Sequence, residues 1–129
     1  MAIPTSCFFQ CSSLRIVYNL SQCTSIGDSA FYECHALTNS DVSKSSSIEA
    51  YAFFGCTGLV TIKIKPGVSI GMCAFQDCTN LELVYNLNKC TSLGTECGSF
   101  MGCSKLRNTS IENCNEVPYN TFERCTSLT

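Results

Sequence analysis

Cysteine is the residue type with the greatest capacity for chemistry in this chain. The 129 residues include twelve cysteines but only one histidine. Thiols can pair as disulfides, bind metal ions or act as nucleophiles. Six cysteines recur every 22 to 25 residues, namely Cys11, Cys34, Cys56, Cys78, Cys103 and Cys125. Three more occupy a second equivalent place, namely Cys23, Cys90 and Cys114.

Three interpretations of these cysteines stay open. Equivalent residues of stacked repeats lie about 4.8 Å apart, so disulfides between neighbouring repeats are geometrically possible. A cysteine in every repeat is explained more simply by packing, because cysteine is a small and readily buried hydrophobe. We therefore favour buried free thiols over scattered disulfides. A metal site is the weakest interpretation, since no Cys-x-x-Cys occurs. We expect the most reactive thiols at Cys73 together with Cys78, or at Cys97.

Catalysis finds little support in the sequence. The single histidine, His35, follows Cys34 at a place where every other repeat carries serine or threonine. A nucleophilic pair would need an exposed thiol, whereas the repeat position of Cys34 predicts burial. The ten carboxylates form no repeated pair, and the glycines form no phosphate-binding loop. We predict neither an enzyme nor a cofactor.

The elements that position the cysteines follow from the repeat itself. The pattern Phe-x-x-Cys-x-x-Leu occurs six times, and its phenylalanines are separated by 23, 22, 22, 25 and 22 residues. A fixed period in this range is typical of a solenoid, in which each unit buries its apolar face against its neighbours. The pattern phenylalanines are Phe8, Phe31, Phe53, Phe75, Phe100 and Phe122.

Each repeat combines two periodicities. Ile26, Phe31 and Cys34 belong to a series spaced by three or four residues, which predicts one or two helical or 3₁₀ turns. After the pattern leucine comes a short alternating run, clearest at residues 59–64, which predicts a strand with one buried face. Strand and short helical segment alternating every 22 to 25 residues imply parallel strands and an α/β solenoid over residues 1–129.

Residues 48–70 carry the pattern most clearly, as Ile48-Glu-Ala-Tyr-Ala-Phe-Phe-Gly-Cys-Thr-Gly-Leu-Val-Thr-Ile-Lys-Ile-Lys-Pro-Gly-Val-Ser-Ile70. This pattern resembles the BspA-like branch of the leucine-rich repeat family, found in surface antigens of bacteria and protozoa. The resemblance covers the whole chain. It implies a right-handed curved solenoid, a role in adhesion or protein binding, and a cell-surface or secreted location. It also implies a protein ligand, such as a host or extracellular-matrix protein.

A solenoid binds through extended surfaces, so the outward residues of the strands are the candidate protein-binding face. Four residues after each pattern leucine these are Tyr18, Asp41, Lys63, Tyr85 and Ser110. Tyr18 and Tyr85 share the context Val-Tyr-Asn-Leu, and exposed aromatic residues often anchor interfaces. The alternative is that both tyrosines only cover neighbouring strands and contribute β propensity.

Composition and charge narrow the function classes. A formal net charge of −2 and scattered basic residues give no reason to expect a nucleic-acid partner. No apolar run approaches the ~18 residues that would span a bilayer, and we expect no leader peptide from the first residues. Neither end carries an obvious cap, so we expect a fragment of a longer array. A surface adhesin is favoured through the resemblance, and an intracellular interaction scaffold of the same fold is the alternative.

Overall fold

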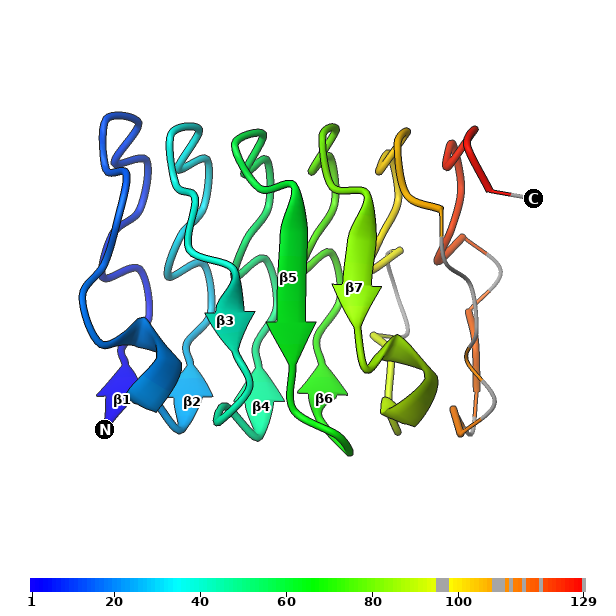
Figure 1. Cartoon of the computed structure of the whole chain (residues 1–129), viewed down its shortest axis with the longest axis horizontal. Helices are drawn as coiled ribbons and strands as arrows, with labels where there is room; N and C mark the ends of the chain where they lie inside the picture. The colour runs from blue at the N-terminus through cyan, green and yellow to red at the C-terminus, as the bar shows by residue number, and fades with distance from the viewer. Residues whose placement is uncertain (95–97, 108–110, 112, 115, 119, 129) are drawn as a thin grey trace.

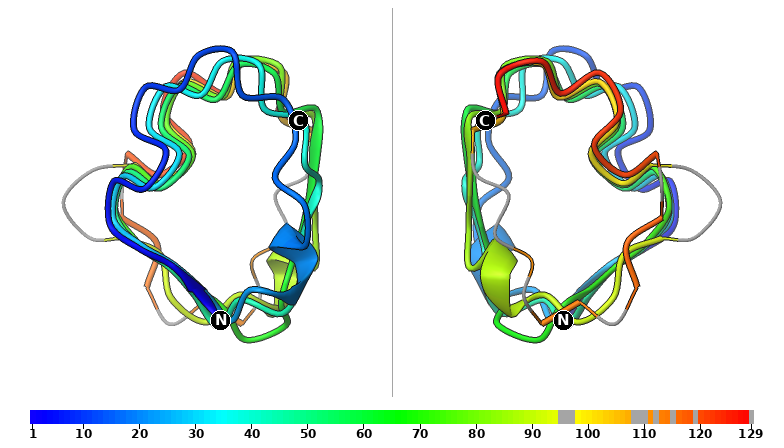
Figure 2. Two further views of the ribbon diagram at one scale, coloured as in Figure 1. Left: turned by 90° about the vertical axis from the view of Figure 1, so that its left-hand side faces the viewer. Right: turned by 90° about the vertical axis from the view of Figure 1, so that its right-hand side faces the viewer.

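The computed structural model shows successive coils stacked side by side, with the two termini at opposite ends (Figure 1). Viewed along the stack, the coils superpose on one closed outline (Figure 2). The repeat solenoid predicted from the sequence is confirmed. The structure describes residues 1–94, 98–107, 111, 113–114, 116–118 and 120–128.

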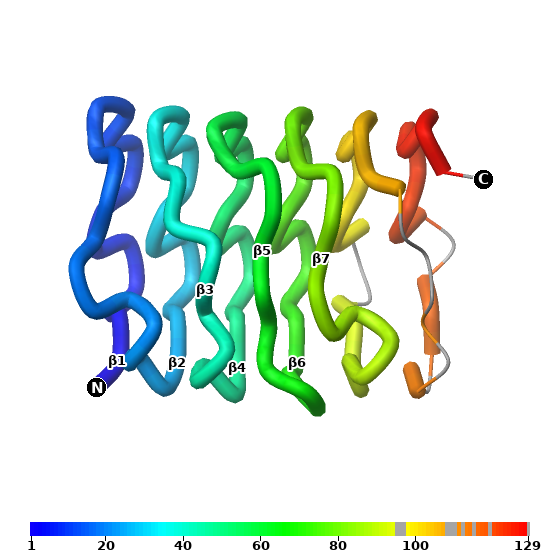
Figure 3. Tube along the Cα trace, viewed as in Figure 1, coloured from blue at the N-terminus to red at the C-terminus, as the bar shows by residue number. Residues whose placement is uncertain are grey.

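Two parallel sheets run along the stack (Figure 3). Sheet A contains β1 (Ala2–Ile3), β2 (Ser25–Ile26), β4 (Ser47–Ile48) and β6 (Ser69–Ile70). Sheet B contains β3 (Asp41–Val42), β5 (Thr61–Ile64) and β7 (Leu83–Tyr85). Sheet B holds the strands expected after the pattern leucines. Sheet A is a finding that the sequence did not predict, because its isoleucines also fitted a helical spacing.

The segment around each pattern phenylalanine is a run of tight turns. In the second coil the amide of Ala30 donates to Gly27 O at 3.1 Å within the coil, whereas the amide of Phe31 donates to Ala52 O of the next coil at 2.8 Å. Ser29 and Glu33 flank Phe31 with φ of 55° and 54°, in the left-handed region. We expected helical turns at this place. The structure has no helical turn there. Hydrogen bonds within the coil alternate with hydrogen bonds to the next coil, and the latter connect each turn to its neighbour.

The 3₁₀ helices lie instead beyond sheet B. They are η1 (Leu20–Gln22) and η2 (Leu87–Lys89). Each follows an asparagine with positive φ, 66° at Asn19 and 71° at Asn86, and each falls in a repeat that has one extra residue after its pattern leucine. The left-handed asparagine and the single 3₁₀ turn therefore absorb the extra residue without displacing the buried leucine that follows.

The core consists of columns of identical residues. The four inner phenylalanines stack with ring centroids 5.2 to 5.3 Å apart and are fully buried. The inner pattern cysteines and leucines are fully buried as well. These columns are continuous through the interior, as the repeat predicted. The inner members are Phe31, Phe53, Phe75, Phe100, Cys34, Cys56, Cys78, Cys103, Leu37, Leu59, Leu81 and Leu106.

Candidate functional site

The pattern cysteines make one recurring contact. The thiol of Cys56 donates to the carbonyl oxygen of Phe31 in the preceding coil at 3.0 Å, and the thiol of Cys34 likewise donates to Phe8 O at 3.0 Å. Five of the six pattern cysteines repeat this bond, at 3.0 to 3.1 Å. The remaining one, Cys11, belongs to the first coil and is exposed. A small buried residue with a weak donor is what this place requires.

Burial makes these thiols poor nucleophiles. Desolvation raises the pKa of Cys34 from its ordinary value of 9.0 to about 11, although a backbone amide at Cys11 opposes the rise. The same cause raises the pKa of Cys125 to about 12. His35, the neighbour of Cys34, is exposed while Cys34 is fully buried. A thiolate nucleophile is therefore disfavoured at Cys34 at neutral pH.

The cysteines of the described residues differ in oxidation state. Ten are free thiols, and Cys73 is disulfide-bonded. Cys78 is among the free thiols and donates to Phe53 O, so Cys73 and Cys78 do not form a disulfide with each other. Cys97 lies outside the described residues. Within the part of the chain that the structure describes, no three His, Cys, Asp or Glu side chains are grouped so as to hold a metal ion.

Sheet B brings three of the predicted face residues into one row. Lys63 is in register with Asp41 on one side and with Tyr85 on the other. Ile62 and Val84, beside them in the same strands, are buried, so the row points away from the core. Tyr18 lies in the turn before η1, without strand pairing, and is 87% exposed, whereas Tyr85 is 52% exposed. Ser110 lies outside the described residues.

Local hydrogen bonds fix the charge of Asp41. Its Oδ1 accepts from the hydroxyl of Ser43 at 2.6 Å and from the amide of Ser43 at 2.9 Å. These two bonds lower the pKa of Asp41, and the nearby Lys63 adds to the effect. The row therefore presents a fixed negative charge beside a positive one at neutral pH. Opposite charges on neighbouring strands also favour this register.

A second outward row lies two residues after the pattern leucines. It runs from Ile16 through Asn39 and Thr61 to Leu83. Ile16 is 52% exposed, and Thr61 is paired with Leu83 across β5 and β7. The two rows together form what we call the sheet B face, defined by Ile16, Tyr18, Asn39, Asp41, Thr61, Lys63, Leu83 and Tyr85. Apolar and aromatic side chains thus flank a polar centre that carries both signs of charge.

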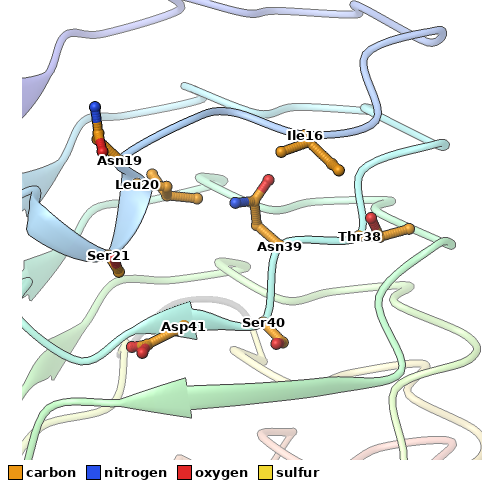
Figure 4. Close-up of a pocket in the computed structure, with 8 residues that line it drawn as sticks. All are labelled: Ile16, Asn19, Leu20, Ser21, Thr38, Asn39, Ser40 and Asp41. Atoms are coloured by element: carbon orange, nitrogen blue, oxygen red, sulfur yellow. The ribbon is translucent and has the colours of Figure 1, made fainter.

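An open pocket interrupts the sheet B face between the first two coils. Asn39 replaces backbone pairing there: its Oδ1 accepts from the amide of Val17 at 2.8 Å, and its Nδ2 donates to Val17 O at 3.0 Å. Figure 4 shows the Asn39 side chain pointing from its own segment toward the neighbouring segment that carries Ile16 and Asn19. The pocket has a volume of about 350 Å³. Its lining is Ile16, Asn19, Leu20, Ser21, Thr38, Asn39, Ser40 and Asp41. Such a hollow can receive one side chain of a bound partner.

Sequence reasoning missed an aromatic stack on the outer side of the turns. Phe9, Tyr32 and Phe54, each directly after a pattern phenylalanine, stack with centroids 4.8 Å apart. Tyr51 packs obliquely against Tyr32 and Phe54. The available signal was an aromatic residue at this position in three consecutive repeats. The stack ends at the fourth repeat, where Gln76 takes the place.

Comparison with protein families agrees with this geometry. The model of the BspA type leucine rich repeat region matches residues 1–129 in six copies. The chain belongs to the BspA-type leucine-rich repeat family. The resemblance suggested by the sequence is thereby confirmed, and the family supports a protein-interaction repeat module that is typically non-catalytic.

Solved structures of leucine-rich repeat proteins share the fold. A leucine-rich repeat protein of T. pallidum superposes with a TM-score of 0.69 at 22% identity, covering 100% of this chain and 72% of that one. A leucine-rich repeat protein of Bacteroides ovatus gives 0.55 at 25% identity, and a leucine rich cell surface protein of Faecalibacterium prausnitzii gives 0.53 at 22% identity. Each covers 84% of this BspA-type chain, which spans 35% and 45% of their respective lengths.

Comparison with curated proteins finds no match to this sequence. Among the described residues, none of the helices has the length and apolar character needed to cross a membrane.

Proposed function

We propose that this BspA-type chain is a non-catalytic protein-binding module of a cell-surface or secreted adhesin or surface antigen, and that it binds its protein ligand through the sheet B face. The supporting observation is the registered row of Asp41, Lys63 and Tyr85. Its side chains point outward from strands whose alternate residues are buried in the core. A pre-organised surface loses little conformational freedom on binding. The location is supported by the cell-surface neighbour and by the family.

The chemistry of the face suits a protein partner. Tyr18 and Tyr85 are exposed aromatic residues with a hydroxyl at the tip, and tyrosine is one of the residue types enriched in interface hot spots. Asp41 and Lys63 lie between them and can orient a partner through opposite charges. Because both signs are present, the face favours neither a uniformly acidic nor a uniformly basic ligand, and nucleic acid remains outside the proposal.

The experiment is a binding screen followed by substitution on the face. The purified chain is immobilised and tested by biolayer interferometry against purified host-surface and extracellular-matrix proteins. For a ligand found in this way, Tyr85→Ala should weaken affinity by about thirtyfold, the effect of losing one hot spot of about 2 kcal/mol. Lys63→Glu should weaken the affinity as well. It would place a second carboxylate beside that of Asp41, so the face would lose its positive charge and present two like charges to the ligand.

Matched controls use residues that are not part of the sheet B face. Phe9→Ala removes an exposed aromatic ring from the turn side, and Lys89→Glu makes the same charge change as Lys63→Glu in η2. Both should leave affinity within about twofold of the unaltered chain, as surface changes outside an interface do. A ligand whose affinity responds to the controls but not to Tyr85→Ala would refute the sheet B face as the binding surface.

An intracellular interaction scaffold is the second candidate, and the free thiols favour it. Cys7 and Cys11 are exposed and unpaired, which is uncommon in oxidising compartments. Alkylation of the native cells before lysis, followed by fractionation, separates the two candidates. Recovery in the cytosol with Cys7 and Cys11 reduced would support the scaffold, and recovery at the surface would support the adhesin.

A further inference from the structure

The pocket of the sheet B face lies between segments 16–21 and 38–41, which belong to two neighbouring coils. Its volume of about 350 Å³ is near the lower end of the roughly 300–1,000 Å³ typical of ligand pockets, so it suits one long side chain. Figure 4 shows Ile16 and Asp41 on opposite sides of Asn39. The pocket is therefore apolar on one side and carries a carboxylate on the other.

Side-chain oxygens with free hydrogen-bonding capacity line this pocket. Asp41 Oδ1 already accepts two hydrogen bonds from the residue two positions on, whereas Asp41 Oδ2 has no partner among the described residues. The side chains of Asn19 and Ser40 likewise make no hydrogen bond within the described part of the chain. Ser21 Oγ accepts one long bond, at 3.4 Å, from the side chain that follows it. All four side chains can therefore accept hydrogen bonds from a ligand.

The charge in the pocket has one sign. None of the eight lining residues is basic, and Asp41 is ionised at neutral pH because the hydrogen bonds from Ser43 lower its pKa. Lys63 is in register with Asp41 on the side away from the first coil, and no ion pair joins the two among the described residues. The pocket therefore favours a cationic ligand group and disfavours an anionic one.

We infer that the pocket binds the guanidinium group of an arginine side chain that the protein partner of the sheet B face presents, an inference that rests on the proposed function. A guanidinium carries five N–H donors in a planar fork, which the carboxylate and the neighbouring amide and hydroxyl oxygens can accept together. Its methylene stem would lie against Ile16 and Leu20. A lysine ammonium offers three donors from one point, so it matches acceptors that are spread around a pocket less well.

Nuclear magnetic resonance titration of the nitrogen-15 labelled chain tests the inference without a protein ligand. The probes are the N-acetyl methylamides of arginine, lysine and citrulline, the last being a neutral analogue of arginine with nearly the same shape. The arginine probe should cause saturable shifts of the Ser21, Ser40 and Asp41 amides. The lysine probe should bind roughly threefold more weakly. The citrulline probe should bind about tenfold more weakly, because it lacks the charge that strengthens the hydrogen bonds to the carboxylate.

Two matched substitutions assign the binding to the pocket carboxylate. Asp41→Asn keeps the shape of the side chain and should weaken binding of the arginine probe about tenfold. Asp28→Asn removes a carboxylate that also accepts from a neighbouring serine hydroxyl, at 2.7 Å, but that does not line the pocket. This control should bind the arginine probe like the unaltered chain, and circular dichroism verifies the fold of both variants. Equal binding of the arginine and citrulline probes, or equal losses in the two variants, would overturn the inference.

The outcome also separates this inference from the proposed function. If the arginine probe causes no saturable shift while Tyr85→Ala still weakens binding of a protein ligand, the inference is wrong and the proposed function stands. If the probe binds at the pocket but the protein ligand does not respond to Tyr85→Ala, the proposed function is wrong and the pocket is retained as an arginine site.

Discussion

Substitution of a pattern cysteine tests whether packing alone holds the coils together or whether the thiol hydrogen bond contributes as well. Cys56 lies in the middle of the stack, is fully buried, and donates to Phe31 O at 3.0 Å. The amide of Cys34 also donates to that carbonyl at 3.1 Å, so removing the thiol leaves no acceptor unpaired. Cys56→Ala therefore loses buried sulfur and one weak hydrogen bond but creates no orphaned group.

From these losses we expect Cys56→Ala to lower the free energy of unfolding by about 2 kcal/mol. Cys56→Ser should lose only about 1 kcal/mol, since a hydroxyl of similar size can donate to the same carbonyl. Urea unfolding followed by circular dichroism measures both. Cys11 is the matched control, because it occupies the same position of the repeat but is exposed. Cys11→Ala and Cys11→Ser should change stability by less than about 0.5 kcal/mol.

The order of stability among the variants shows whether the thiol hydrogen bond contributes. If Cys56→Ser is less stable than Cys56→Ala, burial of a polar group outweighs the bond and the thiol serves packing only. If the Cys11 variants lose as much as the Cys56 variants, the difference in burial between the first coil and the inner coils is incorrect, and the reasoning from the columns fails with it.

Three further predictions concern the stack as a whole. Stability should fall from about pH 9 toward pH 12, because burial raises the pKa of Cys34 and Cys125 and the unfolded chain therefore loses its thiol protons first as pH rises; alkaline unfolding titrations check this, and a flat profile over that range would contradict it. Phe53→Ala should cost about 4 kcal/mol in urea unfolding, against roughly 1 kcal/mol for Phe9→Ala, whose ring is 45% exposed; equal losses would argue against a buried column. Deleting the first coil, residues 1–22, should lower the unfolding temperature in a graded way, whereas complete loss of folding would indicate a closed domain.

The sequence predicted the columns and the strands of sheet B because both follow from burial. A solenoid core requires the same apolar residue at the same position of every coil. Phe53, Cys56 and Leu59 occupy such positions, and the repetition is visible in the sequence. The extra residue in the first and fourth repeats leaves these columns undisturbed. An insertion is tolerated only where a turn such as that at Asn19 can absorb it.

The turn conformation could not be predicted because spacing alone does not distinguish it from a helix. A helical turn and a run of turns with bonds three residues apart both place Phe31 and Cys34 on one side. What separates them is the left-handed backbone at the flanking positions. At Gly55 the residue type itself indicates a left-handed backbone. Glu33 and Tyr51 adopt the same conformation, although their residue types favour other conformations. The bonds to the next coil, which no local pattern encodes, stabilise it.

The outward row of sheet B was predicted in part for a similar reason. Alternation within a strand located Lys63 and Tyr85 on the outward side, and the common repeat position placed Asp41 beside them. The pocket next to Asn39 depends on a side chain replacing backbone pairing between two irregular coils. Such a feature arises from the departure of one coil from the repeat, so the repeat pattern cannot reveal it.

Nuclear Overhauser contacts between phenylalanine rings test the central claim most directly. In the folded chain, Phe31 should show ring contacts to Phe53, Phe53 to Phe75, and Phe75 to Phe100, in one unbroken series with centroids 5.2 to 5.3 Å apart. Rings that contact water or unrelated segments instead of these neighbours would contradict the stacked coils, and with them the outward face on which the proposed binding depends.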